Sequence, residues 1–484
     1  MNILISMHHA LHTARPYFFL LGLISSSLML MACQNTEEFE RPVMDLPTGS
    51  TTISSVRTTW WTIFHDSELN RLEQQALTYN RDLIRASALV DRATALMQGT
   101  KADELPQANL KAGVNSQELT KGQQHSQSLP DRGRDLWEMS GVLSYEVDLW
   151  GKLRARTEAS RAEALSTIAA RDAVFLRLTA EVASAYINVR TWEEKCRIIS
   201  RVHDSYKQTC AMYEKRFQQG QYPELALRRV QAECSKTLAQ LKKAENALSM
   251  AGSALAVLSG ESPRTIVNGK ILTAGNSNLL PSPPTIPASI PSDVIEMRPD
   301  IYELESRLKS AFYGQKAAWA DRFPSFSLTG ELGQISTDLS KTLNQPNRLY
   351  NAGGNILQTL FDGGKKQATL KASSAEYAAT KATYEQTVLN AFCEIRNALV
   401  ERKKSMEIYD ATRDEVENLR RSWDIASKQY DAGYVGLMDA LDTHRNLLSG
   451  ELDMADAAQM RLNAIVKFCK SLGGGWTRHS KQKA

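Results

Sequence analysis

Two long stretches of the chain carry a helical pattern of small and apolar residues that neither proline nor glycine interrupts. They run from Lys152 to Gln219 and from Lys365 to Ala432. In the second stretch, small residues recur in a heptad pattern that lets neighbouring helices approach closely: Ala368, Ala372, Ala375, Ala379 and Ala382. The pattern predicts two helices of about 100 Å each. Because an ordinary globular helix is far shorter, this length indicates a coiled coil or a tubular assembly.

Each long helix is predicted to end at a glycine and to be followed by a shorter helix that returns. Gly220 and Gly433 stand at these ends, where glycine supplies the left-handed conformation of a helix C-cap. Each half of the chain therefore holds a helical hairpin with a tight tip. The returning helices are predicted over Glu224–Leu258 and Leu437–Leu472, and earlier helices over Ser67–Lys101 and Ile301–Asp321.

Alternation of apolar and polar residues predicts two strands in each half of the chain. The four are Gln107–Leu119, Glu138–Leu149, Phe326–Ile335 and Tyr350–Phe361. Strands of about ten residues can cross an outer membrane, but a membrane barrel needs about eight of them. Open sheet edges cannot lie in lipid, because their backbone groups would lack partners. If these strands span a membrane, the chain must oligomerise, and three chains would supply twelve strands.

The chain is a tandem repeat. Four landmark pairs stand 213 positions apart: Gly151 and Gly364, Glu181 and Glu394, Gly220 and Gly433, and Gly260 and Gly473. A stretch rich in proline, serine and asparagine separates the copies and indicates a linker. We therefore expect a first repeat at 61–261, a linker at 262–297, a second repeat at 298–476 and a tail at 477–484. Each repeat holds a helix, two strands and a long helical hairpin.

The N-terminus has the features of a lipoprotein signal. An apolar run from Pro16 to Ala32 follows Arg15 and is typical of a secretory signal. It ends in Leu30-Met31-Ala32-Cys33, which resembles the bacterial lipobox, although Met31 is an unusual occupant. We expect a signal peptide at 1–32 and a tether at 33–60 that is lipidated on Cys33. Acyl chains there would contribute roughly 0.8 kcal/mol of membrane affinity per buried CH₂. The alternative is an uncleaved anchor with an incidental cysteine.

Composition excludes several classes of function. The formal net charge is +4, too small to indicate nucleic-acid binding without a basic run or an aromatic platform. The eight histidines are scattered without HExxH or CxxC spacing, so neither a metal site nor a cofactor is predicted. A tethered enzyme is disfavoured, because the sequence has no nucleophile elbow or triad pattern. Fourteen dispersed methionines give no special support for copper export.

The remaining five cysteines show no disulfide framework. An odd number cannot all pair within one chain. Cys210 lies on the apolar stripe of the first long helix, where a buried inert thiol is expected. Cys210 and Cys234 lie symmetrically about Tyr222, so a disulfide between them stays open.

Six motifs, in their order along the chain, resemble those of the outer-membrane factors, the TolC and OprM group, and in particular their NodT-type lipoprotein branch. The resemblance covers nearly all of the mature chain. The motifs are Trp60-Trp61 with Phe64 and Leu69, Tyr145-Glu146-Val147-Asp148-Leu149-Trp150-Gly151-Lys152, Met297-Arg298-Pro299-Asp300-Ile301, Phe323-Pro324-Ser325-Phe326, Leu360-Phe361-Asp362-Gly363-Gly364 and Leu472-Gly473-Gly474-Gly475-Trp476.

The resemblance implies a mixed, mainly α fold with membrane β-structure. Three chains would form a twelve-stranded β-barrel in the outer membrane and a helical tunnel through the periplasm. Its implied partners are a periplasmic adaptor (membrane fusion protein) and an inner-membrane RND transporter, and the cargo passes without chemical change. Lipid on Cys33 would anchor the homotrimer to the outer membrane. One alternative is a type I protein-secretion duct. Another is a coiled-coil scaffold lipoprotein, but a scaffold would not explain the paired strands.

The resemblance also implies a gate at the second hairpin tip. Asp439 and Asp442 share one face at a helix start, and in three chains they would form two stacked carboxylate rings that attract cations. Tyr430 resembles the family's gate tyrosine, whereas Val435 replaces a basic residue that some members carry. The alternative is that both acids only stabilise the helix start, through a favourable interaction of their negative charge with the helix dipole. The first copy has Ala226 and Arg229 at the matching positions, so the ring would be threefold. Gly151, Gly363 and Gly364 are expected at strand-to-helix turns.

Overall fold

The computed structural model describes residues 38–42, 44, 59–118, 133–269, 280–281, 283–284, 298–336, 338 and 348–476. Cys33, the expected signal peptide and the C-terminal tail lie outside these residues. The chain forms two compact units. One comprises 1–43, 95–162 and 307–381, and the other 44–94, 163–306 and 382–484. Each unit combines segments of both predicted repeats, so neither repeat is a compact unit by itself.

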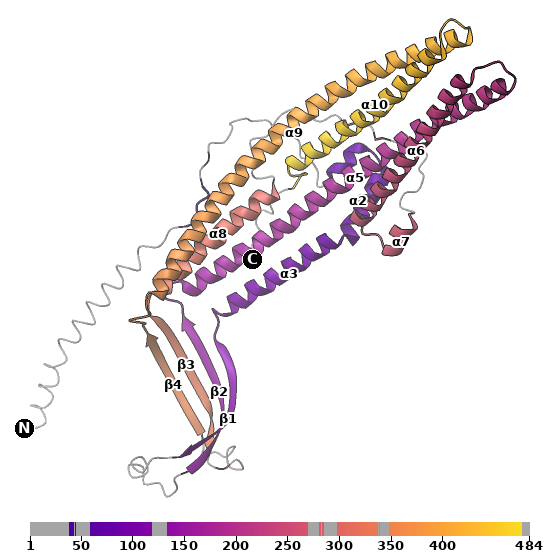
Figure 1. Cartoon of the computed structure of the whole chain (residues 1–484). Coiled ribbons are helices and arrows are strands. Elements are labelled where there is room, and N and C mark those ends of the chain that lie inside the picture. Colours follow the sequence, from indigo (N-terminus) through magenta and orange to yellow (C-terminus); the bar gives the residue numbers. More distant parts are fainter. Residues whose placement is uncertain are drawn as a thin grey trace, which may run out of the picture. The chain divides into compact units, whose positions relative to one another are not determined.

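The helices alternate with the strands in the predicted order (Figure 1). They are η1 Trp60–Phe64, α2 Ser67–Tyr79, α3 Arg81–Ala102, α5 Lys152–Gln218, α6 Glu224–Leu258, α7 Pro263–Asn268, α8 Pro299–Ala320, α9 Lys365–Asp431 and α10 Leu437–Ser471. Both α5 and α9 have 67 residues, which confirms the prediction of two long uninterrupted helices. Among the described residues, no helix has both the length and the apolar content to span a membrane.

One helix prediction is wrong. The single helix expected over Ser67–Lys101 breaks at Asn80, whose backbone is extended (φ −64°, ψ 128°). The Asn80 side chain accepts hydrogen bonds from the N–H groups of Asp82 and Leu83, and so caps α3. Its amide also donates to the Leu258 carbonyl at 2.9 Å, which ties α3 to the end of α6. The structure also shows a short helix, α7, at the start of the predicted linker, where the Ser262 side chain accepts a hydrogen bond from Thr265 N–H.

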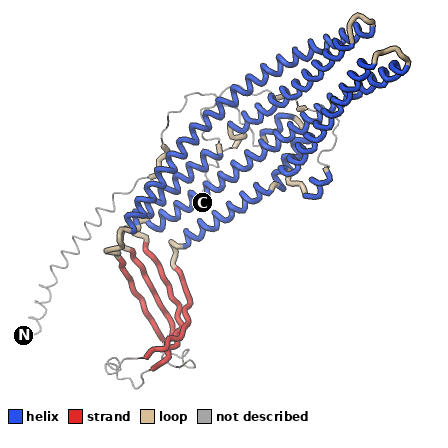
Figure 2. Tube along the Cα trace, in the orientation of Figure 1, coloured by secondary structure: helices blue, strands red, loops and turns tan. Residues whose placement is uncertain are grey.

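The strands form one antiparallel sheet in the order β1-β2-β3-β4 (Figure 1), whose strands are the red segments of Figure 2. Their bounds are β1 Gln107–Glu118, β2 Gly133–Val147, β3 Ser325–Ser336 and β4 Arg348–Leu357. β2 begins earlier than predicted because pairing with β1 continues to Gly133. β4 ends before the predicted Phe361, since the following residues build the turn into α9. Within the described chain, β1 and β4 each pair on one side only.

The second unit has an apolar core built around the N-terminal aromatic residues. Trp60, Trp61 and Phe64 are at most 3% exposed. They belong to one cluster with Leu69 and Leu72 of α2 and with apolar residues of α5, α6 and α10. The Trp60 indole donates to the Thr179 hydroxyl at 3.2 Å. Burying such large rings contributes several kcal/mol of stability, so the tryptophan pair seats the chain's first helices against the hairpins.

Candidate functional site

The sheet has one apolar and one largely polar face. Register places most of the apolar residues on one face, together with Asp135 and Arg348 near the strand ends: Ala108, Leu110, Ala112, Val114, Trp137, Met139, Leu143, Tyr145, Phe326, Leu328, Leu332, Tyr350, Ala352 and Ile356. Several are widely exposed in the single chain, Tyr350 by 78% and Leu110 by 73%. An exposed apolar surface of this kind marks contact with lipid or a partner. Such alternation, apolar outward and polar inward, is the pattern of a membrane barrel strand.

Glycines and aspartates build the turns between strands and long helices. Gly151, Gly363 and Gly364 all have positive φ, between 65° and 88°. Ahead of α5, the Asp148 carboxylate accepts a hydrogen bond from Arg154 N–H at 2.9 Å. Ahead of α9, Asp362 accepts from the N–H groups of Lys366 and Gly364 at 2.9 Å. These bonds to the charged form hold the pKa of Asp362 below its usual range. Both long helices therefore begin with a carboxylate cap.

Aromatic residues brace the first of these turns. The Trp150 indole donates to the Pro324 carbonyl at 2.8 Å and stacks on Phe323, with ring centroids 4.8 Å apart. Tryptophan pairs an apolar body with one polar group, which suits the boundary between membrane and water. The contact also ties the end of β2 to the start of β3.

Both hairpin tips use the same backbone device. Gly220 and Gly433 have φ of 72° and 79°. At each tip the next residue's N–H returns to a carbonyl five positions back, Gln221 to Arg216 and Tyr434 to Gln429. This is the hydrogen-bond pattern of a Schellman motif, which ends a helix through a left-handed residue. The two tips therefore differ in side chains rather than in backbone.

The two predicted gate acids each have a local partner. Asp439 is exposed, and its carboxylate accepts a hydrogen bond from Gly436 N–H at 3.2 Å, which caps α10. Asp442 forms an ion pair with Arg445 one turn later. Arg445 in turn lies 3.3 Å from the Glu233 carboxylate on α6. A cation at 445, rather than one at the Val435 position, thus connects the second tip to the first hairpin.

The third predicted gate residue also joins the two hairpins. The Tyr430 hydroxyl on α9 is hydrogen-bonded to that of Tyr213 on α5. Tyr213 is fully buried and packs beside Tyr222, with ring centroids 4.8 Å apart. Burial, with a contribution from the charge of Asp431, raises the pKa of Tyr430, so the phenol stays protonated as a donor. Periodicity within each helix does not reveal this contact between α5 and α9.

Further from the tip, a polar and aromatic layer binds the hairpins together. The Glu451 carboxylate of α10 is nearly buried and is shared by Arg201 of α5 and Arg420 of α9. His444 stacks on Trp423 at 4.2 Å between ring centroids and also contacts Tyr206. Burial lowers the pKa of His444 and thereby favours the neutral ring.

The pairing of Cys210 with Cys234, which the sequence left open, does not occur in this structure. Both thiols are free. They lie in separate apolar clusters, Cys234 with the residues around Tyr206 and Cys210 with those around Tyr213. Both cysteines therefore contribute to the packing of the hairpins.

Replacing Arg445 by alanine should raise single-channel conductance modestly, because it removes the cation shared by Asp442 and Glu233. A partly exposed ion pair contributes about 0.2–1 kcal/mol, so the gain in conductance should be smaller than that on removing both predicted gate acids. Arg228→Ala is the matched control, since among the described residues Arg228 bonds to Glu224 and Gln231 of its own helix, each at 3.1 Å. Equal conductance of the two variants would contradict a role for Arg445 at the tip.

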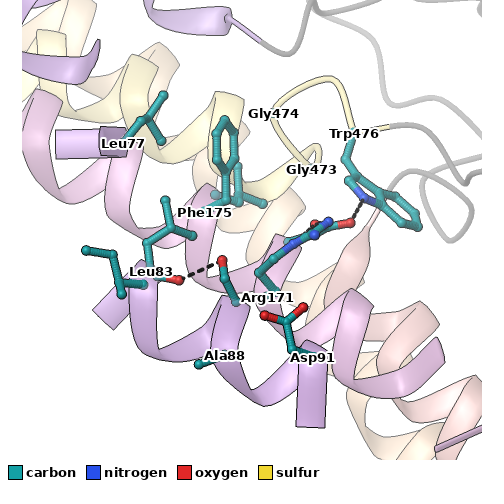
Figure 3. A pocket seen from close by; sticks show the side chains of 13 residues that line it. Leu77, Leu83, Ala88, Asp91, Arg171, Phe175, Gly473, Gly474 and Trp476 are labelled. Atoms are coloured by element: carbon teal, nitrogen blue, oxygen red, sulfur yellow. Dashed lines mark hydrogen bonds and ion pairs between the residues drawn. The ribbon is translucent and has the colours of Figure 1, made fainter. Parts of the chain in front are cut away.

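A cavity of about 680 Å³ lies beside the turn that follows α10 (Figure 3). Leu77, Leu83 and Phe175 supply much of its apolar lining. Its polar side includes Asp172, whose carboxylate accepts a hydrogen bond from the Trp476 indole at 2.9 Å. Its lining includes none of the predicted site residues and none of the strand residues.

Comparison with known proteins gives a consistent result. The family model described as "outer membrane efflux protein" matches residues 72–261 and 290–474. The probable outer membrane lipoprotein SilC of Salmonella typhimurium is 28% identical over 463 residues, covering 94% of this chain and 98% of the relative. The cation efflux system protein CusC of Escherichia coli K12 is 28% identical over 460 residues, covering 93% and 98%.

A solved structure agrees with these relatives. The outer membrane channel CmeC of Campylobacter jejuni superposes with a TM-score of 0.83 at 25% identity, covering 91% of this chain and 96% of that one. Such channels combine a helical barrel with a β-barrel, which confirms the predicted fold class. The matched residues span both copies of the repeat and the whole of the sheet. The chain therefore belongs to the outer membrane efflux protein family, a family of transport channels rather than of enzymes.

Proposed function

We propose that three copies of this chain form the outer-membrane exit duct of a tripartite efflux system, which passively conducts small molecules. The observation that carries this function is the two-faced sheet with its two open edges. Its four strands are too few to close a barrel, and its unpaired edges cannot face lipid. Pairing β4 of one chain with β1 of the next would complete twelve strands, with the apolar face toward lipid and the polar face toward a lumen.

The proposed partners are a periplasmic adaptor and an inner-membrane RND transporter. The relatives' printed names describe efflux of cations, antibiotics, solvents and toluene, which favours small cargo over protein secretion. SilC is named an outer membrane lipoprotein, and this supports an acyl anchor on Cys33 after removal of residues 1–32. The tether 33–60 would then lead into repeats 61–261 and 298–476, joined by the linker 262–297 and followed by the tail 477–484.

Asp439, Asp442 and Tyr430 are the proposed periplasmic gate. Their contacts with Gly436, Arg445 and Tyr213 support a closed tip held by hydrogen bonds and ion pairs. In a threefold assembly, the carboxylates would ring a narrow mouth and attract cations. In this proposal the glycines at the tips and at the strand-to-helix turns have a structural role, because they adopt the positive φ that these turns require.

Mass determination and planar-bilayer recording of the purified, detergent-extracted protein test this function together. We expect a heat-modifiable trimer that gives small, long-lived, cation-selective currents. A monomer without conductance would instead return the chain to the class of coiled-coil scaffold lipoproteins. A trimer that conducts but restores only protein export in a deletion strain would favour the type I secretion duct.

A further inference from the structure

The polar face of the sheet carries a charged cluster that the proposed gate does not use. Among its described side chains, the charged ones are Lys111 on β1, Glu138 and Glu146 on β2, and Glu331 on β3. Glu146 lies at the helix end of β2 and pairs with Lys152. The other three lie together, two residues or fewer along their strands from the level of Ser140.

Ser140 organises this cluster. Its hydroxyl donates to the Glu331 carboxylate at 2.7 Å and lies 3.4 Å from that of Glu138. The Lys111 ammonium lies 2.7 Å from Glu138. Ser140 is 1% exposed and faces Gly333, where an added Cβ would lie 2.5 Å from the Ser140 Cβ. Glycine at 333 therefore lets β3 approach closely enough to bring the second carboxylate to the hydroxyl.

The cluster holds two carboxylates and one ammonium, so each chain contributes one net negative charge at this level. We place it away from lipid, because the opposite face of the sheet carries most of the apolar residues. A lysine on the lipid face of a barrel costs about 2–4 kcal/mol at the bilayer midplane, and a carboxylate costs less. A charged ring in a channel wall attracts counter-ions and repels co-ions. A wall of low dielectric concentrates that field in the water it encloses.

We propose that Lys111, Glu138 and Glu331 form a lumenal charge filter that favours cationic over anionic cargo in the membrane part of the duct. The filter rests on the proposed function, because only three chains around a barrel turn the cluster into a ring. The Debye length is about 30 Å at 0.01 M salt and about 3 Å at 1 M. The filter should therefore act strongly at low ionic strength and vanish at high salt.

Reversal potentials of the full-length trimer in planar bilayers test the filter. The recordings use a KCl gradient with the dilute solution on the strand side, in wild type and in an Asp439→Ala, Asp442→Ala background that removes the two proposed gate carboxylates. Glu138→Gln with Glu331→Gln should lower the K⁺/Cl⁻ permeability ratio by about two- to threefold at low salt. Lys111→Gln should raise the ratio, because it leaves both carboxylates unneutralised.

The opposite signs separate a charge effect from damage to the sheet, which would move both variants in one direction. Asn351→Asp, which places a carboxylate opposite Glu331 on β4, should also raise the ratio. Conducting trimers with one unchanged ratio in all variants would overturn the filter and leave the duct intact. A wild-type protein that forms no conducting trimer would overturn the duct itself, and the filter with it.

Discussion

Asp439→Ala with Asp442→Ala should raise single-channel conductance severalfold. The double change removes the cap on Gly436 N–H and the ion pair with Arg445, and in a trimer it would remove two carboxylate rings from the mouth. A shift of about 1.4 kcal/mol between closed and open states changes their ratio tenfold. Planar-bilayer recording measures the conductance, and block by added divalent cations should weaken in parallel.

Two controls separate charge from helix capping. Asp439→Asn with Asp442→Asn keeps an acceptor for Gly436 N–H but removes both charges, so it should reproduce most of the gain. Glu224→Ala removes the helix-start acid of the other tip, where Glu224 pairs only within α6, and should change little. If conductance and cation block stay at wild-type values in the double variant, the gate assignment is wrong.

Glu73→Gln should stabilise the protein at neutral pH. Glu73 of α2 is completely buried, and neither carboxylate oxygen has a hydrogen-bond partner in the structure. Its helical neighbours Leu69 and Ala76 belong to the apolar core. Burial raises the pKa of this carboxyl well above its usual range, because the charged form has lost its water.

The sign of the pH dependence follows from that raised pKa. Between the ordinary glutamate pKa and the folded one, the folded chain holds a proton that the unfolded chain has released. Stability from this group is fully present at low pH and falls as pH rises, by up to about 1.4 kcal/mol per pH unit. The midpoint of thermal unfolding should therefore drop less steeply with pH in Glu73→Gln than in wild type.

Moving the carboxylate to the surface provides the control. Gln74 is exposed, so Glu73→Gln with Gln74→Glu keeps the net charge while it relocates the acid by one residue. The unfolding midpoint of this double variant should match that of Glu73→Gln from about pH 4 to about pH 8, a range that extends upward from the usual glutamate pKa of about 4.3. If the midpoint of thermal unfolding depends on pH in the same way in wild type and in Glu73→Gln, the prediction is wrong, and the buried carboxyl has a partner in the assembled protein.

Local sequence patterns predicted most of the helices and strands, but they did not predict the side-chain contacts between these elements. Absence of proline and glycine placed the start of α5 at Lys152 and that of α9 at Lys365, and both starts are confirmed. Asn80 ends α2 and caps α3 through local hydrogen bonds, but its further bond to the Leu258 carbonyl joins positions 178 apart and leaves no local pattern in the sequence. The Tyr213–Tyr430 and Arg445–Glu233 contacts likewise join distant positions, which periodicity within one helix cannot reveal.

The buried acid and the charged cluster on the sheet were hidden for a related reason. Glu73 is followed by Gln74 and Gln75 in a segment that looks like a solvated helix face, so only packing identifies it as a core residue. The cluster around Ser140 depends on the register between β2 and β3. A slip of one residue would send every side chain to the other face, and alternation alone does not fix which residues stand opposite each other.

In the part of the chain that the structure describes, β1 and β4 each have one unpaired edge, and in a trimer these edges have a genetic consequence. One subunit with a defective strand edge prevents the barrel from closing even when the other two subunits are intact. A single defective subunit should therefore inactivate the whole trimer. The fraction of functional trimers then falls as the cube of the fraction of intact subunits. A cell that makes normal and edge-damaged subunits in equal amounts should lose far more than half of its export capacity, so such alleles should be dominant over wild type.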